Sequence, residues 1–138
     1  LYLDITKKWV MGIGMIGNFS KLQTIMNKLI EEGNFVASVV ASEDGLVVAS
    51  AVKENVNQDI AAALTSLVQQ TVDRVKKELE IGDIRYVIID GKKGKVIFKS
   101  IDGKSESLIL AVIVPPSVKT FKRLISKAAR EIGDIFSL

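Results

Sequence analysis

Residues 57–79 constrain the fold most strongly, because their apolar positions cover more of a helix than one sheet can bury. A helix lying on a single sheet needs an apolar stripe of roughly 100°. Here the stripe is wider, and its first turns consist of small residues that allow close backbone approach. The apolar positions at helical spacing are Ile60, Ala61, Leu64, Leu67, Val68, Val72, Val75 and Leu79, widened by Ala62, Ala63 and Thr71. We therefore predict a helix about 35 Å long that is covered on two sides, although a lone domain of this size supplies only one cover.

Local signals mark both ends of this helix. Asn57 is a typical N-cap residue, and Asp59 lies in the first turn, where the helix dipole favours a negative charge. Gly82 follows the last apolar position, and glycine is a common helix stop. The sequence thus predicts a helix that starts at Asn57 and runs to about Leu79.

The segment SVVASEDGLVVAS, residues 38–50, predicts a β-hairpin. Its two VVAS runs favour paired strands, and Asp44-Gly45 is a typical two-residue turn. Such a turn would place Ala41 opposite Val48 and Val40 opposite Ala49. The acidic pair Glu43 and Asp44 raises the alternative of a metal or acid–base site. Adjacent turn residues diverge, so we favour a solvated turn in which Gly45 supplies the backbone freedom.

The remaining elements follow from the same patterns. Ser20 is interpreted as the N-cap of a short helix over 21–32, which Gly33 ends. Strands are predicted at 84–90, 95–101 and 107–114, joined by turns at 91–94 and 102–104. The run SLILAVIV at 107–114 is almost wholly apolar, which favours a central strand, whereas 84–90 would be an edge. After Pro115 and Pro116, Ser117 is interpreted as the cap of a final helix.

This element order, α-β-β-α-β-β-β-α, predicts a three-layer α/β/α sandwich around a five-stranded, mainly antiparallel sheet of the profilin-like kind. A chain of 138 residues is long enough for one such domain. We assign residues 20–138 to the domain and residues 1–19 to an N-terminal extension or lead-in.

Composition argues against enzymatic function. The chain has no histidine and no cysteine, which removes triads, thiol nucleophiles and the usual zinc ligands. Gly12, Gly14 and Gly17 form GxGxxG, but no predicted strand precedes them and no βαβ unit follows, so we assign them to the lead-in. The sequence GKKG at 91–94 lacks the phosphate-loop spacing. We expect no catalytic residues, no metal and no cofactor.

Charge and hydropathy limit the partners. A net charge of +3 with only eight aromatic residues is unlike a nucleic-acid binder. The chain has no apolar run near the ~18 residues of a membrane span and no signal peptide pattern, so a cytoplasmic location is expected. The last helix carries basic residues that would suit an acidic partner, an anionic membrane surface or solvent, and we favour solvent. Those residues are Lys119, Lys122, Arg123, Lys127 and Arg130. Membrane contact is expected only indirectly, if at all.

Taken together, residues 20–136 resemble the Roadblock family of dynein light chains and prokaryotic small-GTPase regulators. The resemblance is carried by the first helix, the strand–turn–strand unit, the long helix, the IGD link into the next strand, the following hairpin, and the apolar strand before the last helix. In this sequence those segments are LQTIMNKLIEE, VASVVASEDGLVVAS, DIAAALTSLVQQTVDRVKKEL, IRYVIID, KVIFKSI and SLILAVIV. The order of elements matches throughout.

The resemblance implies a non-catalytic scaffold that forms a homodimer through its long helix and third strand and binds a Ras-like small GTPase. The implied dimer contacts are Leu64, Leu67, Val68, Thr71, Val75, Arg85, Val87 and Ile89. The implied outward groups for partner contact are Gln58, Thr65, Gln69, Asp73 and Lys76. The alternative is a small-ligand-sensing module of the profilin-like or PAS-like kind, which would need a cavity with convergent polar groups between sheet and helix.

Overall fold

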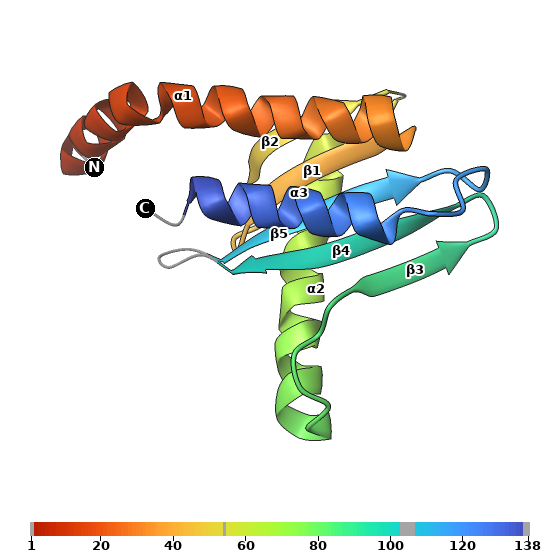
Figure 1. Cartoon of the computed structure of the whole chain (residues 1–138). Coiled ribbons are helices and arrows are strands. Elements are labelled where there is room, and N and C mark those ends of the chain that lie inside the picture. Colours follow the sequence, from red (N-terminus) through yellow and green to blue (C-terminus); the bar gives the residue numbers. More distant parts are fainter. Residues whose placement is uncertain (1, 54, 103–106, 137–138) are drawn as a thin grey trace.

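The computed structural model describes residues 2–53, 55–102 and 107–136, and for residues 2–17 and 102 the path of the backbone. Figure 1 shows three helices around one sheet. In chain order the elements are α1 (Tyr2–Gly33), β1 (Ala37–Ser42), β2 (Val47–Val52), α2 (Gln58–Leu79), β3 (Val87–Gly91), β4 (Gly94–Asp102), β5 (Ser107–Val114) and α3 (Lys122–Ile135). The predicted fold class is confirmed.

The five strands form one sheet in the order β2-β1-β5-β4-β3, and every neighbouring pair is antiparallel. β5 occupies the centre, as its apolar sequence predicts, and Leu110 pairs there with Val40 on one side and Lys99 on the other. β2 and β3 are the edges. The predicted turn at 91–94 between β3 and β4 is also present, because Gly91 pairs with Gly94.

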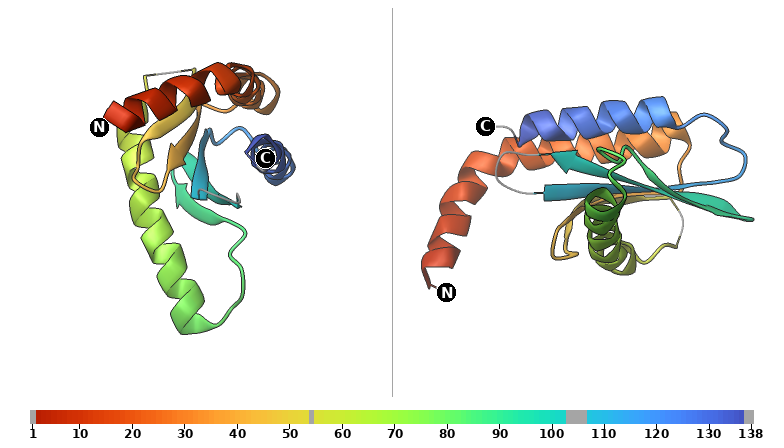
Figure 2. Two further views of the ribbon diagram at one scale, coloured as in Figure 1. Left: turned by 90° about the vertical axis from the view of Figure 1, so that its left-hand side faces the viewer. Right: turned by 90° about the horizontal axis from the view of Figure 1, so that it is seen from below.

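The helices lie in two layers, with α1 and α3 side by side on one face of the sheet and α2 alone on the other (Figure 2). The side chains of β4 alternate between these faces. Ile97 and Ile101 join the larger core under α1 and α3, with Leu22, Leu110 and Ile125 among its members. Phe98 joins a smaller core with Val68 of α2 and Val87 of β3. The core beneath α2 therefore contains fewer buried residues than the core beneath α1 and α3.

The first hairpin differs from the prediction by one residue. The amide of Gly45 donates to the carbonyl of Ser42 at 2.9 Å, and the amide of Ser42 donates to the carbonyl of Leu46 at 3.0 Å. Gly45 has φ +79°, so the connection is a three-residue loop whose last residue is left-handed. Val40 pairs with Ala49 as expected, but Ala41 pairs with Val47, not Val48. The two-residue turn was wrong because DG fits the end of the longer loop equally well.

Replacing Gly45 by alanine is expected to lower the free energy of unfolding by more than the same change at Gly82. Both glycines have positive φ, which costs an L-residue about 1–2 kcal/mol. A Cβ at Gly45 would also lie 3.1 Å from the Cα of Ala63 in α2, whereas nothing lies within 4 Å of one at Gly82. Urea unfolding of both variants measures the difference; equal losses would show that the hairpin does not press on α2.

The first helix begins far earlier than predicted. α1 starts at Tyr2, so Ser20 lies inside it and is not an N-cap; the Ser20 carbonyl accepts a hydrogen bond from Thr24 Oγ1 at 2.9 Å. Residues 12–17 are also helical, so their glycines lie within a helix and not at a strand-to-helix turn. The chain has no proline before Pro115, and a helix without proline can continue through single glycines. The division at residue 19 remains a prediction.

Two further boundaries move. α3 begins at Lys122 with Phe121 as its N-cap residue, so Ser117 does not cap it. Residues 115–118 form a turn instead, in which the Val118 amide donates to the Pro115 carbonyl at 3.1 Å. β3 begins at Val87, not at residue 84. Most of the predicted 102–104 turn lies outside the described residues.

Across the described part of the chain, no helix combines the length and apolarity that a membrane span requires.

Candidate interaction surface

α2 begins at the cap residue that the sequence indicates, but the residue that ends it is Glu80 and not the predicted stop, Gly82. The Asn57 side-chain oxygen accepts hydrogen bonds from the amides of Asp59 at 3.0 Å and Ile60 at 3.2 Å. These bonds satisfy amides that would otherwise lack partners at the helix start. At the other end Glu80 is left-handed with φ 51°, which ends the helix after Leu79. The predicted extent of this helix is correct.

One side of α2 rests on the sheet, but only for part of its length. Ala62, Thr65 and Val72 are its buried residues. Gln69 lies on the same side, where its side-chain oxygen accepts a hydrogen bond from Ser100 Oγ of β4 at 3.2 Å. No residue of α2 after Val72 is buried, and Figure 1 shows the last turns of the helix projecting past the sheet. The C-terminal third of α2 thus has no sheet of its own chain beneath it.

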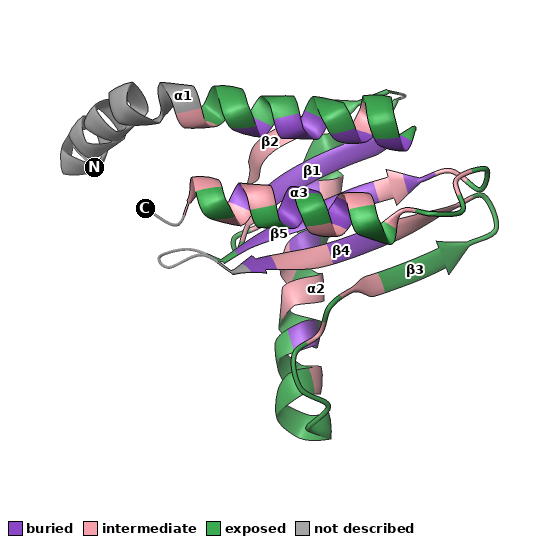
Figure 3. Ribbon diagram, viewed as in Figure 1, coloured by how far each residue is buried: buried purple, intermediate pink, exposed green. Residues whose placement is uncertain are grey.

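The opposite side of α2 exposes large apolar residues. Leu67 is 59% exposed, and Ile60 and Leu64 in the same stripe are also exposed. Leu79 is 62% exposed for a different reason, because it follows Val72 by two turns on the sheet-facing side, where the helix projects past the sheet. Ile81, just after the helix, is 65% exposed. In Figure 3 most residues of β3 and of the last turns of α2 are coloured green, as exposed. An exposed leucine alone is ordinary, but several in one stripe on a single helix mark a site of protein contact.

β3 presents an open sheet edge beside this stripe. It pairs with β4 alone, and Val87 and Ile89 lie on the α2 side of the sheet, opposite Phe98 and Val96. Ile89 is 56% exposed. The other edge is partly blocked, because Gln23 of α1 donates a hydrogen bond to the Ser50 carbonyl of β2 at 2.9 Å. We call Leu64, Leu67, Leu79, Ile81, Val87 and Ile89 the α2–β3 surface.

The residues implied as dimer contacts lie on or beside this surface. Leu64, Leu67, Thr71, Arg85 and Ile89 are exposed, and Val68, Val75 and Val87 are half-buried. Their role in contact with a second chain stays a prediction. The implied dimer contacts do not include the exposed residues Ile60, Leu79 and Ile81, although Ile60 and Leu79 are among the apolar positions at helical spacing.

Two of the five residues implied for partner contact do not point outward. Thr65 is fully buried, and its hydroxyl donates to the Ala62 carbonyl. Gln69 is half-buried against Ser100. The expectation was wrong for both because apolar residues cover so much of α2 that the sequence does not show which polar side chains face the sheet. Gln58, Asp73 and Lys76 are exposed, and Lys76 forms an ion pair with Asp83 at 3.1 Å.

The described residues offer little chemistry besides contact. They contain no group of histidine, cysteine, aspartate or glutamate side chains that could hold a metal ion. Glu43 and Asp44 lie exposed on the hairpin loop, as expected. The cavity between α2 and the sheet, bounded by Val68, Val87 and Phe98 among others, measures about 10 Å³. That volume is below the several hundred Å³ of a metabolite site.

Comparison with known proteins agrees with this architecture. A model of the Roadblock/LC7 domain matches residues 21–113. No curated protein sequence matches the chain significantly. Myxococcus xanthus MglB superposes with a TM-score of 0.75 at 21% identity, over 86% of this chain and 96% of that one. The gliding protein MglB of Thermus thermophilus gives 0.76 at 12% identity over 86% and 90%. Acanthamoeba castellanii profilin IA gives 0.55 at 15% identity over 81% and 96%.

Proposed function

Because the chain belongs to the Roadblock/LC7 domain family, we propose that it is a non-catalytic, homodimeric scaffold that binds and regulates a Ras-like small GTPase. The observation that carries the dimer is the α2–β3 surface, where an exposed apolar stripe lies beside an unpaired strand edge. The GTPase partner rests on the resemblance to Roadblock regulators.

Pairing of β3 with its own copy across a twofold axis would use both halves of the α2–β3 surface. A flat, unprotected edge with three consecutive β-branched residues, Val87, Ile88 and Ile89, exposes the chain to aggregation unless it is covered. The projecting turns of α2 would then lie over the sheet of the second chain and bury Leu79. Each leucine side chain buried this way contributes roughly 1.5–3 kcal/mol.

We place the GTPase on the α2 side of the dimer, where Gln58, Asp73 and Lys76 are exposed. Within the chain these three side chains also contact Ser50, Gln69 and Asp83, respectively. The absence of histidine and cysteine from the sequence fits a regulator that adjusts its partner by binding, without a catalytic group of its own. The ligand-sensing alternative receives no support from the cavity beneath α2, which is too small for a metabolite.

The oligomeric state and the partner can be tested together. Sedimentation of the purified protein is expected to give twice the chain mass of 15.1 kDa at micromolar concentration. The immobilised protein is expected to retain Ras-like GTPases from the same genome, with a preference for either the GTP-loaded or the GDP-loaded form. A stable monomer would remove the dimer. A dimer that retains neither loaded form would keep the scaffold and refute the GTPase partner.

A further inference from the structure

Positive charge is concentrated in the segments that form the β3–β4 hairpin, β5 and α3. Residues 84–101 and 107–130 contain ten of the 19 lysines and arginines but only one of the 16 acidic residues, Asp90. They form the β3–β4 hairpin, β5, the loop after it, and most of α3. A chain with a mild net charge of +3 therefore carries a strongly basic region and an acidic remainder. Such segregation produces a local field that attracts an anionic partner.

Four of these cations, at positions 119, 122, 123 and 127, lie together where α3 begins. The ion pairs found among the described residues lie elsewhere in the fold. They join Arg74 to Glu78, Lys76 to Asp83, and Lys95 to Asp90 at 3.8 Å. None of these pairs includes a cation of the group at the start of α3. Within the chain, Lys122 lies over the Tyr86 ring, and Lys127 lines a small hollow with Glu32 and Glu131. Lys119 and Arg123 are exposed to solvent or to an outside partner.

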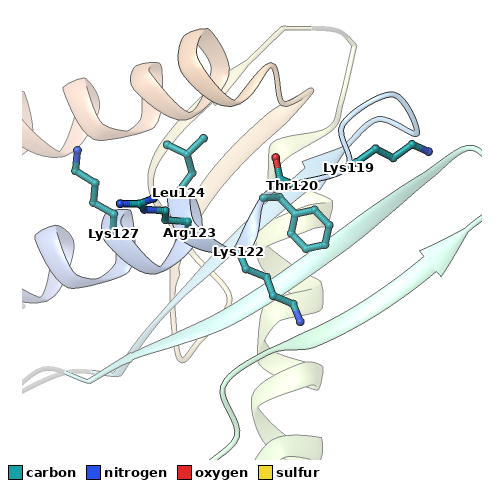
Figure 4. Close-up of a pocket in the computed structure, with 7 residues that line it drawn as sticks. Lys119, Thr120, Lys122, Arg123, Leu124 and Lys127 are labelled. Atoms are coloured by element: carbon teal, nitrogen blue, oxygen red, sulfur yellow. The ribbon is translucent and has the colours of Figure 1, made fainter.

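The basic residues of α3 surround a hollow. It lies where the loop after β5 enters α3, has a volume of about 760 Å³, and is open to solvent (Figure 4). Its lining is Lys119, Thr120, Phe121, Lys122, Arg123, Leu124 and Lys127, and we call it the basic hollow. Phe121 and Leu124 are half-buried and pack on the larger core, so they form an apolar floor. The four cationic side chains are exposed around it.

Two lysines next to the hollow share one aromatic ring. Lys99 Nζ of β4 lies 4.5 Å from the centre of the Tyr86 ring, and Lys122 Nζ lies 5.6 Å from it. The Tyr86 hydroxyl is hydrogen-bonded to Ser126 of α3, which holds the ring under Lys122. Two ammonium groups on the same ring repel each other, and an anion placed between them and the hollow would relieve that repulsion.

We propose that the basic hollow binds an acidic segment of a partner protein, with carboxylates on the lysine and arginine rim and an apolar side chain over Phe121 and Leu124. The site lies on the face of the sheet opposite α2 (Figure 2), so it can be occupied while the α2–β3 surface is covered. It does not depend on the GTPase proposal.

A peptide fits this hollow better than a bilayer or a nucleic acid. A membrane surface is bound most firmly when an apolar side chain projects into it. The exposed large apolar residues of the described chain lie elsewhere, on α1, the β1–β2 hairpin, α2, residue 81 and β3. Single-stranded nucleic acid is bound on exposed aromatic platforms, whereas Phe121 and Tyr86 are half-buried. Two acidic residues, Glu131 of α3 and Glu32 of α1, line a smaller neighbouring hollow with Lys127, at the α1 side of the rim.

Fluorescence anisotropy with the full chain tests the proposal. The probe is a labelled peptide of Glu-Glu-Leu repeats, and the comparison peptides replace leucine by serine or glutamate by lysine. We expect the Glu-Glu-Leu peptide to bind in a salt-sensitive way and Lys122→Gln/Arg123→Gln to weaken it by about tenfold, because rim charges guide and hold an anionic partner. The matched control, Arg74→Gln/Lys77→Gln on α2, removes the same number of charges from the other face and is expected to leave binding unchanged.

A second double variant separates the loss of peptide binding from a disturbance of folding. Lys122 contacts the Tyr86 ring, so its replacement could disturb packing, whereas Lys119 and Lys127 are exposed on the hollow without such a contact. Lys119→Gln/Lys127→Gln must therefore weaken the same peptide. Equal binding of the serine peptide, equal loss in the α2 control, or binding to phosphatidylglycerol vesicles but not to the peptide would each overturn the proposal, as would the absence of peptide binding.

Discussion

Replacement of Leu67 by glutamate is expected to turn the dimer into a monomer. Leu67 is 59% exposed in the single chain and lies in the middle of the outward stripe of α2, where a second copy would cover it. Leucine and glutamate have similar helix propensities, so the helix itself should persist. In the dimer, however, the new carboxylate would be buried without a partner in both chains. We expect a loss of about 3 kcal/mol or more, at least roughly a hundredfold in the dissociation constant.

The matched control is Gln70→Glu, which adds the same charge to the polar, exposed side of the same helix. Sedimentation velocity over a range of concentrations measures both variants, and circular dichroism checks that each is folded. The Gln70 variant should keep the dimer mass. If Leu67→Glu sediments as the unchanged dimer, α2 is not at the interface, and the proposed assembly is wrong.

Truncation of Phe35 to alanine is expected to give the largest loss of stability in the chain. Phe35 is fully buried, and its ring lies against the end of α1, where a Cβ added at Gly33 would come within 2.8 Å of ring atom Cζ. The ring thus fills the space between that helix end and the sheet. Loss of a buried phenylalanine typically lowers the free energy of unfolding by about 3–5 kcal/mol, through lost burial and the cavity that remains.

Phe19→Ala supplies the comparison, because Phe19 belongs to α1, the helix whose end Phe35 packs against, but is 46% exposed. Its loss should change the free energy of unfolding by less than about 1 kcal/mol. Both variants are measured by urea unfolding at one protein concentration, since a dimer makes apparent stability depend on concentration. Similar losses in the two variants would show that Phe35 is not part of a close-packed core.

Helix ends and strand positions were predicted correctly where they depend on neighbouring residues along the chain. The cap at Asn57 and the end of α2 at Leu79 follow from local hydrogen bonding and from helical periodicity. The central position of β5 follows from its apolar run, because a strand covered on both faces has no polar side. The Roadblock resemblance summarised that order of elements, and the match over residues 21–113 agrees with it.

Prediction from the sequence was wrong where two local backbone structures are almost equal in energy. Ser20 and Ser117 are both good cap residues, yet one lies within α1 and the other in the turn before α3. A cap signal permits a helix end without requiring one, because the helix continues when nothing interrupts it. The first hairpin shows the same ambiguity, since DG suits both a two-residue and a three-residue loop, and the packing of Gly45 against Ala63 goes with the longer one.

The sequence by itself determined that α2 has more apolar surface than one sheet can cover, because periodicity depends only on residue order. Only the tertiary structure decided which side of that helix faces the sheet, and so placed Thr65 and Gln69 inside and Leu67 outside. It also brought Lys99 of β4 and Lys122 of α3 onto one tyrosine ring. Both outcomes depend on how elements distant in sequence pack together, and that packing is set by the whole fold and not by any one segment.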